Sequence, residues 1–345
     1  LSNPPDRVQG SDMPTPHMSS VPVVLHTPAH AVLAAPLMLG YWPDNSLCAI
    51  FVDAQERVAL IMRWDADAQA AFPAIPPAAA GESSPRTVHL VVYTVAPRPG
   101  EPPAAPDQSA WRHAEAALRD SEVSLGWILV AGCHGDDVAW TCVEGSPADR
   151  EVRVLTGPEI SRQAQRWGLP PWSATRSEYV GDIDPDRDAR DHVMTRLPRH
   201  SPVKESSRDA AIAKVDDRLT DQQLSAEEIA EILVALTDVQ VRDTVLWDLM
   251  HEDPSHWQGI ARCLARIVSA SPDSHAAAPA TLLAIVRWQI GDGSRASAAI
   301  ARALEADPAY TLARLVDGCL ATGMHPSVWR AGLADLSREA CRRAA

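Results

Sequence analysis

The sequence predicts two folded parts: an α/β domain with a mixed sheet and a βαβ unit, followed by an all-α domain. Apolar runs of strand length occur only before residue 144, whereas helix-period patterns with capping residues fill the chain after Asp184. The length of 345 residues also exceeds the ~250–300 residues that one core usually supports. We therefore expect a disordered leader at residues 1–20, an α/β domain at 21–182 and a helical domain at 183–345.

Composition and charge exclude several classes of protein. Apolar residues make up 46% of the chain, which is enough for packed cores and excludes global disorder. The net charge of −14 repels phosphate backbones, so we expect no nucleic-acid partner. No apolar run approaches the ~20 residues that a membrane-spanning helix needs, so we expect no membrane span.

The cysteines and the first residues indicate a compartment. Residues 1–20 are polar and lack the apolar core of a secretory signal. The six cysteines form no CxxC pair, and Cys48, Cys263 and Cys319 occupy apolar-periodic positions typical of small buried side chains. His251 and His256 are five residues apart with a proline between them, which is poor geometry for a metal site. We expect a cytoplasmic protein with reduced thiols, no metal and no cofactor.

The first elements in chain order are a helix and a hairpin. Residues 28–39 suit a helix because Thr27 is a good N-cap residue and Gly40 a good helix end. The apolar runs at 46–52 and 57–64 are separated only by a short polar turn. Two strands joined so closely predict an antiparallel hairpin.

A βαβ unit is expected next. Residues 87–95 and 123–131 are typical of strands and flank a helical pattern at 108–121. Such a crossover makes the two strands parallel, with a right-handed connection. Residues 138–143 follow a tight polar turn at 134–137, so this strand is expected to return antiparallel to the one before it.

The second half contains helical patterns alone. Ser225 and Glu228 form a capping box that opens one helix, and Asp238 precedes another. Apolar residues from Ile260 to Val268 repeat at helical spacing. Three further helical patterns lie at 282–290, 296–304 and 312–320, with Gly291 and Gly323 as stops and Pro308 as the start of the last.

Residues 277–310 resemble a tetratricopeptide repeat, a hairpin of two helices. Small residues at Ala284, Ala296 and Ala303 let the helices cross closely, and Pro308 begins the next unit. The resemblance implies a peptide-binding groove on the hairpin, lined by Thr281, Trp288, Gln289 and Tyr310. The alternative is that Trp288 and Tyr310 pack the core.

The segment Leu39–Leu47, LGYWPDNSL, is rich in turn residues. It is either a ligand-binding loop or a capped turn between a helix and a strand. Its residue types favour the structural turn. We expect the turn to depend on Gly40 and Pro43, and we expect Asp44 or Ser46 to hydrogen-bond local backbone.

An alternative pocket lies beyond the predicted parallel strands, because open α/β sheets bind ligands at the carboxyl ends of such strands. Arg98, His134 and Asp136 would line it. Cys133, His134 and Asp136 have the residue types of a nucleophile, a base and an orienting group. Neighbours in sequence rarely face one another, however, and His134–Asp137 suits a hairpin turn, so we expect no catalytic residues there.

The stretch LGYWPDNSLCAIFV resembles a domain-of-unknown-function family of actinobacteria. Its members carry Leu-Gly-aromatic-x-Pro-x-x-Ser-Leu before a valine-rich strand, and the matching residues here are Leu39, Gly40, Tyr41, Pro43, Ser46 and Leu47. Segments 241–250 and 281–317 also resemble the family, so the resemblance covers most of residues 25–330. The family usually has a proline-rich loop that contains cysteines. This chain keeps Cys142 and lacks the other cysteines of that loop. The resemblance implies the fold and the compartment but no activity.

The sequence favours a protein-interaction or regulatory module that uses its helical-hairpin surface and binds a protein partner. The repeat-like hairpin and the 11 tryptophans support this interpretation, because tryptophan often anchors interfaces. The alternative is a small-molecule-binding protein or an enzyme, with its site at the loops after the parallel strands. No complete catalytic motif is present in the sequence, so we favour the module over the enzyme.

Overall fold

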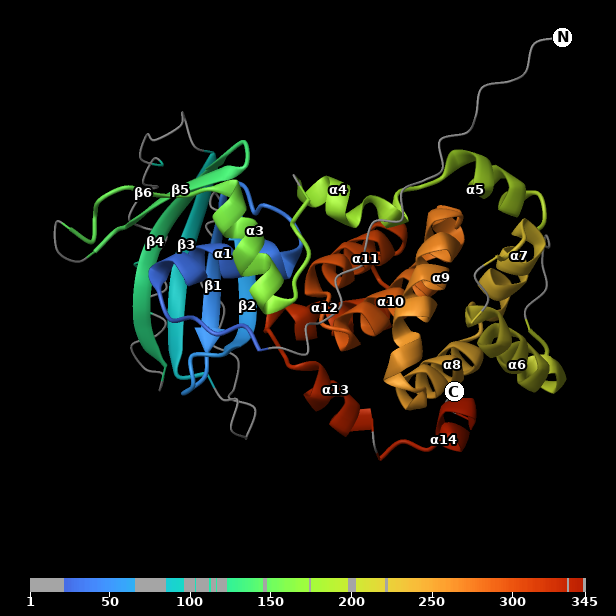
Figure 1. Ribbon diagram of the computed structural model, residues 1–345. Coiled ribbons are helices and arrows are strands. Elements are labelled where there is room, and N and C mark those ends of the chain that lie inside the picture. Colours follow the sequence, from blue (N-terminus) through green and yellow to red (C-terminus); the bar gives the residue numbers. More distant parts are fainter. Residues whose placement is uncertain are drawn as a thin grey trace, which may run out of the picture.

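The computed structural model describes residues 22–65, 85–95, 103, 112, 116, 123–144, 148–173, 175–197, 203–220, 223–333 and 335–343. A sheet with helices against it forms one side of the molecule, and a group of helices forms the other (Figure 1). The predicted order of an α/β part and then an all-α part is confirmed. The expected leader and most of the helix predicted at 108–121 lie outside the described residues. The division into domains at residue 182 stays a prediction.

The described strands form one mixed sheet in the order β2-β1-β3-β4-β5-β6. They are β1 (Ser46–Val52), β2 (Val58–Asp65), β3 (Thr87–Val95), β4 (Ser124–His134), β5 (Asp137–Cys142) and β6 (Arg153–Leu155). The β3–β4 pair is parallel, and the other neighbouring pairs are antiparallel. The predicted hairpin, the parallel pair and the returning strand are therefore confirmed.

The sheet is buried at its centre, and two of the described helices cover one of its faces. All seven residues of β1 are buried, which explains why its sequence is a continuous apolar run and not an alternating one. Helices α1 (Pro28–Leu39) and α3 (Gly157–Trp167) pack against the same side of the sheet (Figure 1). Helix α3 and strand β6 were not predicted. The strand is too short to give an apolar run, but a capping box of Thr156 and Glu159 marks the start of α3.

The chain beyond Thr175 is helical in its described residues. Its helices are α4 (Arg176–Val180), α5 (Arg187–Met194), α6 (Arg208–Leu219), α7 (Ala226–Ala235), α8 (Val239–His251), α9 (Trp257–Ser269), α10 (Asp273–Gln289), α11 (Gly293–Ala306), α12 (Thr311–Ala321), α13 (Pro326–Leu333) and α14 (Arg338–Arg343). The capping box at Ser225 and the N-cap at Asp238 are confirmed. The start predicted at Pro308 is wrong, because Tyr310 keeps the extended N-cap conformation and α12 begins at Thr311.

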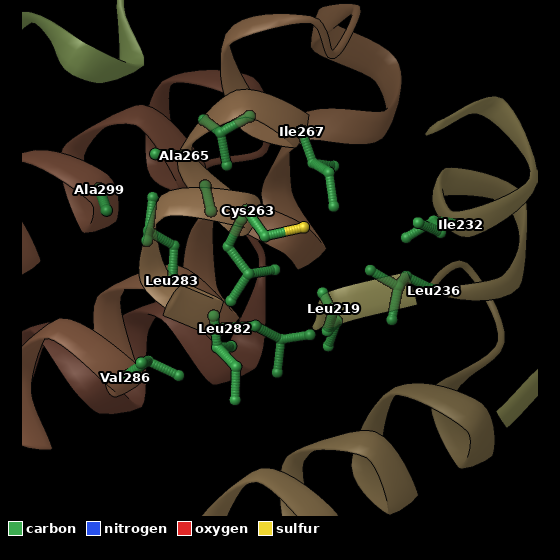
Figure 2. Close-up of a cluster of buried hydrophobic side chains, with 14 of the residues drawn as sticks. Leu219, Ile232, Leu236, Cys263, Ala265, Ile267, Leu282, Leu283, Val286 and Ala299 are labelled. Carbon is green, nitrogen blue, oxygen red and sulfur yellow. The ribbon is translucent and has the colours of Figure 1, made fainter. Parts of the chain in front are cut away.

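Helix α10 lies at the centre of the helical part. Side chains from α6, α7, α9, α10 and α11 meet in one apolar cluster, in which Cys263 is a small buried side chain (Figure 2). The hairpin of α10 and α11 is closely packed because Ala284, Ala296 and Ala303 are all fully buried. Close approach of two helices requires such small side chains, as the sequence predicted.

Gly40 ends α1 and allows the first half to approach α4. Its φ of 83° lies in the left-handed region, and its N–H donates to the Pro36 carbonyl. A Cβ atom at this position would lie 2.2 Å from Cε2 of Tyr179 on α4. Both the backbone conformation and the neighbouring ring therefore require a residue without a side chain.

We expect Gly40→Ala to lower the free energy of unfolding by about 1–2 kcal/mol from the left-handed backbone alone, with a further loss as the Tyr179 ring is displaced. Gly318→Ala is the matched control, because Gly318 lies within α12 and no atom lies within 4 Å of an added Cβ there. Urea unfolding of both variants measures the difference. Equal stability of the two variants would contradict the close contact at Tyr179.

Candidate functional site

The carboxyl edge of the parallel strands is the first region to consider. Cys133 near the end of β4 pairs in register with Val95 at the end of β3. The β4–β5 hairpin turns here, and the Asp137 carboxylate accepts a hydrogen bond from the Gly157 N–H at the start of α3 (3.0 Å). Asp44 also comes close enough to Cys133 to influence its ionisation. The structure thus brings the 40–46 turn and the 134–137 turn to one edge of the sheet, whereas Arg98 lies outside the described residues.

The chemistry of this edge does not activate a nucleophile. Burial, followed by the charges of Asp44, Asp136 and Asp137, raises the pKa of the Cys133 thiol to about 11. The thiol donates a hydrogen bond to the Gly135 carbonyl (3.3 Å). At neutral pH the thiol is therefore protonated, and only a thiolate attacks as a nucleophile. His134 and Asp136 are exposed at the tip of the hairpin.

The turn between α1 and β1 has the contacts that a structural role requires. Ser46 is fully buried, and its hydroxyl donates to the Asp44 carbonyl (2.7 Å). Leu39 and Leu47 pack into the apolar clusters on the two faces of the sheet. Pro43 lies between them, in the segment that leads to the hydrogen-bonded turn. The effect of this turn on stability, as opposed to ligand binding, stays a prediction.

Three of the four residues predicted to line a groove on the helical hairpin are buried. The Thr281 hydroxyl donates to the Ala277 carbonyl of its own helix (2.7 Å). The Trp288 ring lies 5.8 Å from that of Trp329 on α13. The side-chain amide of Gln289 has no hydrogen-bond partner among the described residues. These three side chains pack inside the helical part, and a role in binding peptide stays a prediction.

Tyr310, the fourth of these residues, joins the hairpin to α8. Its hydroxyl accepts a hydrogen bond from Nη1 of Arg242 (3.0 Å), and the Arg242 guanidinium lies 5.5 Å from the centre of its ring. Arg242 also pairs with Asp243 on α8 (2.6 Å). Tyr310 therefore fixes α8 against the start of α12.

A polar cluster that is buried except at Asp182 connects the sheet to the helices, and we call it the junction cluster. Its members are Tyr41, Tyr179, Asp182, Arg287, Asp292 and Arg295. The rings of Tyr41 and Tyr179 lie 5.7 Å apart. The Arg295 guanidinium lies 4.1 Å from the centre of the Tyr179 ring, and its Nε donates to the Tyr179 carbonyl (2.8 Å). Tyr41, which lies next to the sheet, is thus connected through Tyr179 of α4 to Arg295 of the helical hairpin.

The charges of the junction cluster compensate one another. Arg287 is 3% exposed and pairs with Asp182, while the Asp292 carboxylate accepts hydrogen bonds from the Arg295 N–H (3.1 Å) and the Tyr179 hydroxyl. Burial raises the pKa of Asp292 and lowers that of Arg287, and in each case the opposite charges nearby counteract the shift. Two arginines and two aspartates share the site, so no charge is buried without a partner.

A second polar region lies where α14 contacts α6 and α8 (Figure 1). We call it the acidic surface, and its members are Asp209, Asp216 and Asp248. The Arg338 guanidinium donates from Nε and Nη2 to the two Asp248 oxygens (2.7 and 2.8 Å), and Arg342 pairs with Asp209. Nε1 of Trp247 on α8 donates to the Leu336 carbonyl (2.9 Å). None of the side chains of α14 is buried.

Two carboxyl groups of the acidic surface lie within hydrogen-bonding reach of each other. Asp216 on α6 is hydrogen-bonded to Asp248 on α8, and burial together with the Asp248 charge raises the pKa of Asp216 to about 7. Glu252 raises this pKa further, while Arg338 of α14 opposes the shift. The charge of the acidic surface therefore changes near neutral pH and responds to the presence of α14.

The described part of the chain contains neither a metal-binding cluster nor a membrane-spanning helix. It contains no group of three or more His, Cys, Asp or Glu side chains arranged to hold a metal ion. Nor does any of its helices combine the length and the apolar character needed to cross a membrane. His251 and His256 have separate partners, because His251 stacks on Trp247 and His256 bonds to Glu252.

Comparison with known proteins identifies the family. The family model described as "Domain of unknown function (DUF4192)" matches residues 28–327. The chain belongs to this family. The DUF4192 match thus includes the junction cluster and the acidic surface, and it ends before α14. No curated protein and no solved structure gives a significant match.

The junction cluster and the acidic surface were not predicted from the sequence. Both regions of this DUF4192 protein combine residues far apart in the chain, such as Tyr41 with Tyr179 and Asp209 with Arg342. One usable signal was present, since Arg338 and Arg342 are four residues apart and lie on one face of a helix. A second signal in the sequence was the position of Tyr41 directly after Gly40 in the family-like motif.

We expect Arg287→Met to lower the free energy of unfolding by about 2–3 kcal/mol, less than the ~3–5 kcal/mol typical of a fully buried pair. The loss is smaller because Asp182, left without its partner, is 40% exposed and can be hydrated. Lys214→Met is the control, since Lys214 and Glu231 form an exposed pair on the surface. Urea unfolding that showed equal effects for both variants would contradict a stabilising junction cluster.

Proposed function

We propose that this DUF4192 protein is a cytoplasmic protein-interaction or regulatory module whose helical part binds a helical segment of a protein. The observation that supports the proposal is the way α14 lies on α8. Helix α14 has no buried side chain and is held by two arginine–aspartate contacts. The Trp247 indole adds one hydrogen bond to the carbonyl of Leu336, two residues before the helix. Contacts of this kind are typical of reversible interfaces and differ from the packing of a core.

In this proposal the α10–α11 hairpin supports the surface on which α14 lies. Tyr310 follows the hairpin and holds Arg242 on α8. Helix α10 also contacts α7, α8 and α9. A rigid support of this kind keeps a binding surface in one arrangement before a partner arrives, which lowers the entropic cost of binding.

A small-molecule site at the carboxyl edge of the sheet is the second candidate. The observation in its favour is that Asp44, Asp136 and Asp137 converge around Cys133. Three carboxylates at one edge would suit a cationic ligand, since opposite charges attract across a partly buried site. We rank it second because His134, Asp136 and Asp137 are exposed at the tip of a hairpin.

The proposal predicts that a helix added in trans binds to the surface under α14. In the 345-residue chain with Arg338→Glu and Arg342→Glu, like charges repel the chain's own α14 from Asp248 and Asp209. A fluorescent peptide with the sequence of residues 334–345 should then bind saturably, as measured by fluorescence anisotropy. The wild-type chain is the control and should bind less peptide, because α14 occupies the surface. Absence of binding to both proteins would contradict the proposal.

Binding of this peptide should weaken as the pH falls. Arg338 lowers the pKa of Asp216, so the bound state favours the deprotonated carboxyl group, and protonation opposes binding. Burial raises the pKa of Asp216 to about 7, together with the negative charges of Asp248 on α8 and of Glu252, which directly follows α8. We expect affinity to fall about two- to fivefold from one pH unit above this value to one below it. The same host with Asp216→Asn should show a flatter profile, and an unchanged profile would contradict the role of Asp216.

A further inference from the structure

We infer that the acidic surface recognises two arginines four residues apart on one face of a helix, and that α14 occupies it as an intramolecular ligand. A protein partner presenting a helix with the pattern Arg-x-x-x-Arg would compete with α14 for the same contacts. The inference rests on the proposed function, because it specifies the partner of that surface.

The geometry of α14 separates a bound side from a solvent side. Arg338, Cys341 and Arg342 follow the i, i+3, i+4 spacing that places side chains on one helix face. Arg338 and Arg342 both reach aspartates of the acidic surface. Arg343 lies outside this face, is 77% exposed and pairs with Glu339 of α14 itself. Adjacent arginines of one helix therefore have different roles.

The contacts favour arginine over lysine, and they fix which residues of the bound helix face the acidic surface. Both Asp248 oxygens accept from the Arg338 guanidinium, a two-bond arrangement that a lysine ammonium cannot reproduce. The Trp247 indole donates to the carbonyl two residues before Arg338. Its ring is held in place by stacking on His251, with ring centres 3.6 Å apart. The surface thus contacts one backbone carbonyl and two arginines at fixed spacing.

The acidic surface lies inside the region that the family model matches, whereas α14 lies outside it. Asp209, Asp216, Trp247 and Asp248 lie within the DUF4192 match, which ends at residue 327. Helix α14 begins at Arg338, after that match. The surface therefore belongs to the domain that defines the family, whereas α14 is a segment of this chain seated on it.

A double-mutant cycle in trans tests the recognition. The host is the 345-residue chain with Arg338→Glu and Arg342→Glu, with or without Asp248→Asn, and the ligand is the 334–345 peptide. We expect peptide Arg338→Ala or Arg338→Lys to bind about fivefold more weakly to the host, and we expect little further loss when Asp248→Asn is present. Peptide Arg342→Ala should also bind more weakly. Peptide Arg343→Ala is the matched control and should bind as the parent does.

The outcomes separate this inference from the proposed function. If the parent peptide binds and the Arg338 and Arg342 variants bind equally well, the arginine pair is not recognised and the inference is wrong, although the helical part still binds a helix. If no peptide binds, the proposed function itself fails. Far-UV circular dichroism of each host shows that a loss of binding does not come from unfolding.

The intramolecular part is tested in the wild-type chain by thiol labelling of Cys341, located by peptide mass. Cys341 is partly buried against α8. Arg338→Glu should raise its labelling rate about fivefold by releasing α14, while Arg343→Glu should leave it unchanged. Equal rates in the two variants would overturn the intramolecular contact. Light scattering that showed a dimer lost in Arg338→Glu would mean that α14 binds a second copy, which would also overturn the intramolecular part.

Discussion

The arrangement of the whole molecule depends on how Arg287 and Arg295 bind the segment between the two halves. Both arginines come from the helical hairpin, and both contact residues of α4 or the turn that follows it. Tyr179 is central to this contact because its ring meets Tyr41 on one side and the Arg295 guanidinium on the other. A charged group taken out of water requires opposite charges and hydrogen bonds close by, so the positions of all these residues are coupled.

This coupling explains the composition of the family-like motif. Gly40 has no side chain because Tyr179 occupies the space in which one would lie. Tyr41 reaches the helical part and is hydrogen-bonded to Ser294 at the start of α11. Ser46 turns the chain into β1 through its own backbone contact. Residues that resemble an isolated turn in sequence thus connect the sheet to the helices.

Local patterns predicted most of the fold. The limits of α1 and β1 follow from Thr27, Gly40 and a continuous apolar run, each of which acts over a few residues. The short strand β6 could not be predicted, since three residues carry no usable periodicity. The candidate sites were harder to predict from the sequence because they depend on contacts between residues that are far apart in the chain. Asp216 and Asp248 have ordinary sequence surroundings, and only the packing of α6 on α8 gives Asp216 its raised pKa. Thr281 and Trp288 were expected in a groove, yet their burial depends on neighbouring helices that a single repeat does not specify.

The parallel pairing of β3 and β4 has a consequence for how the chain reaches this structure. Every strand pair on either side of it is antiparallel, and two of those pairs join strands that are close in sequence. The parallel pair requires the chain from Val95 to Ser124 to close as one long connection, which costs entropy before any ladder bond forms. Helices α9, α10, α11 and α12 instead pack each on the next one in sequence, an arrangement that forms quickly. We therefore expect formation of the sheet to be the slow step of folding. The helical part should form earlier, before Tyr41 contacts Tyr179.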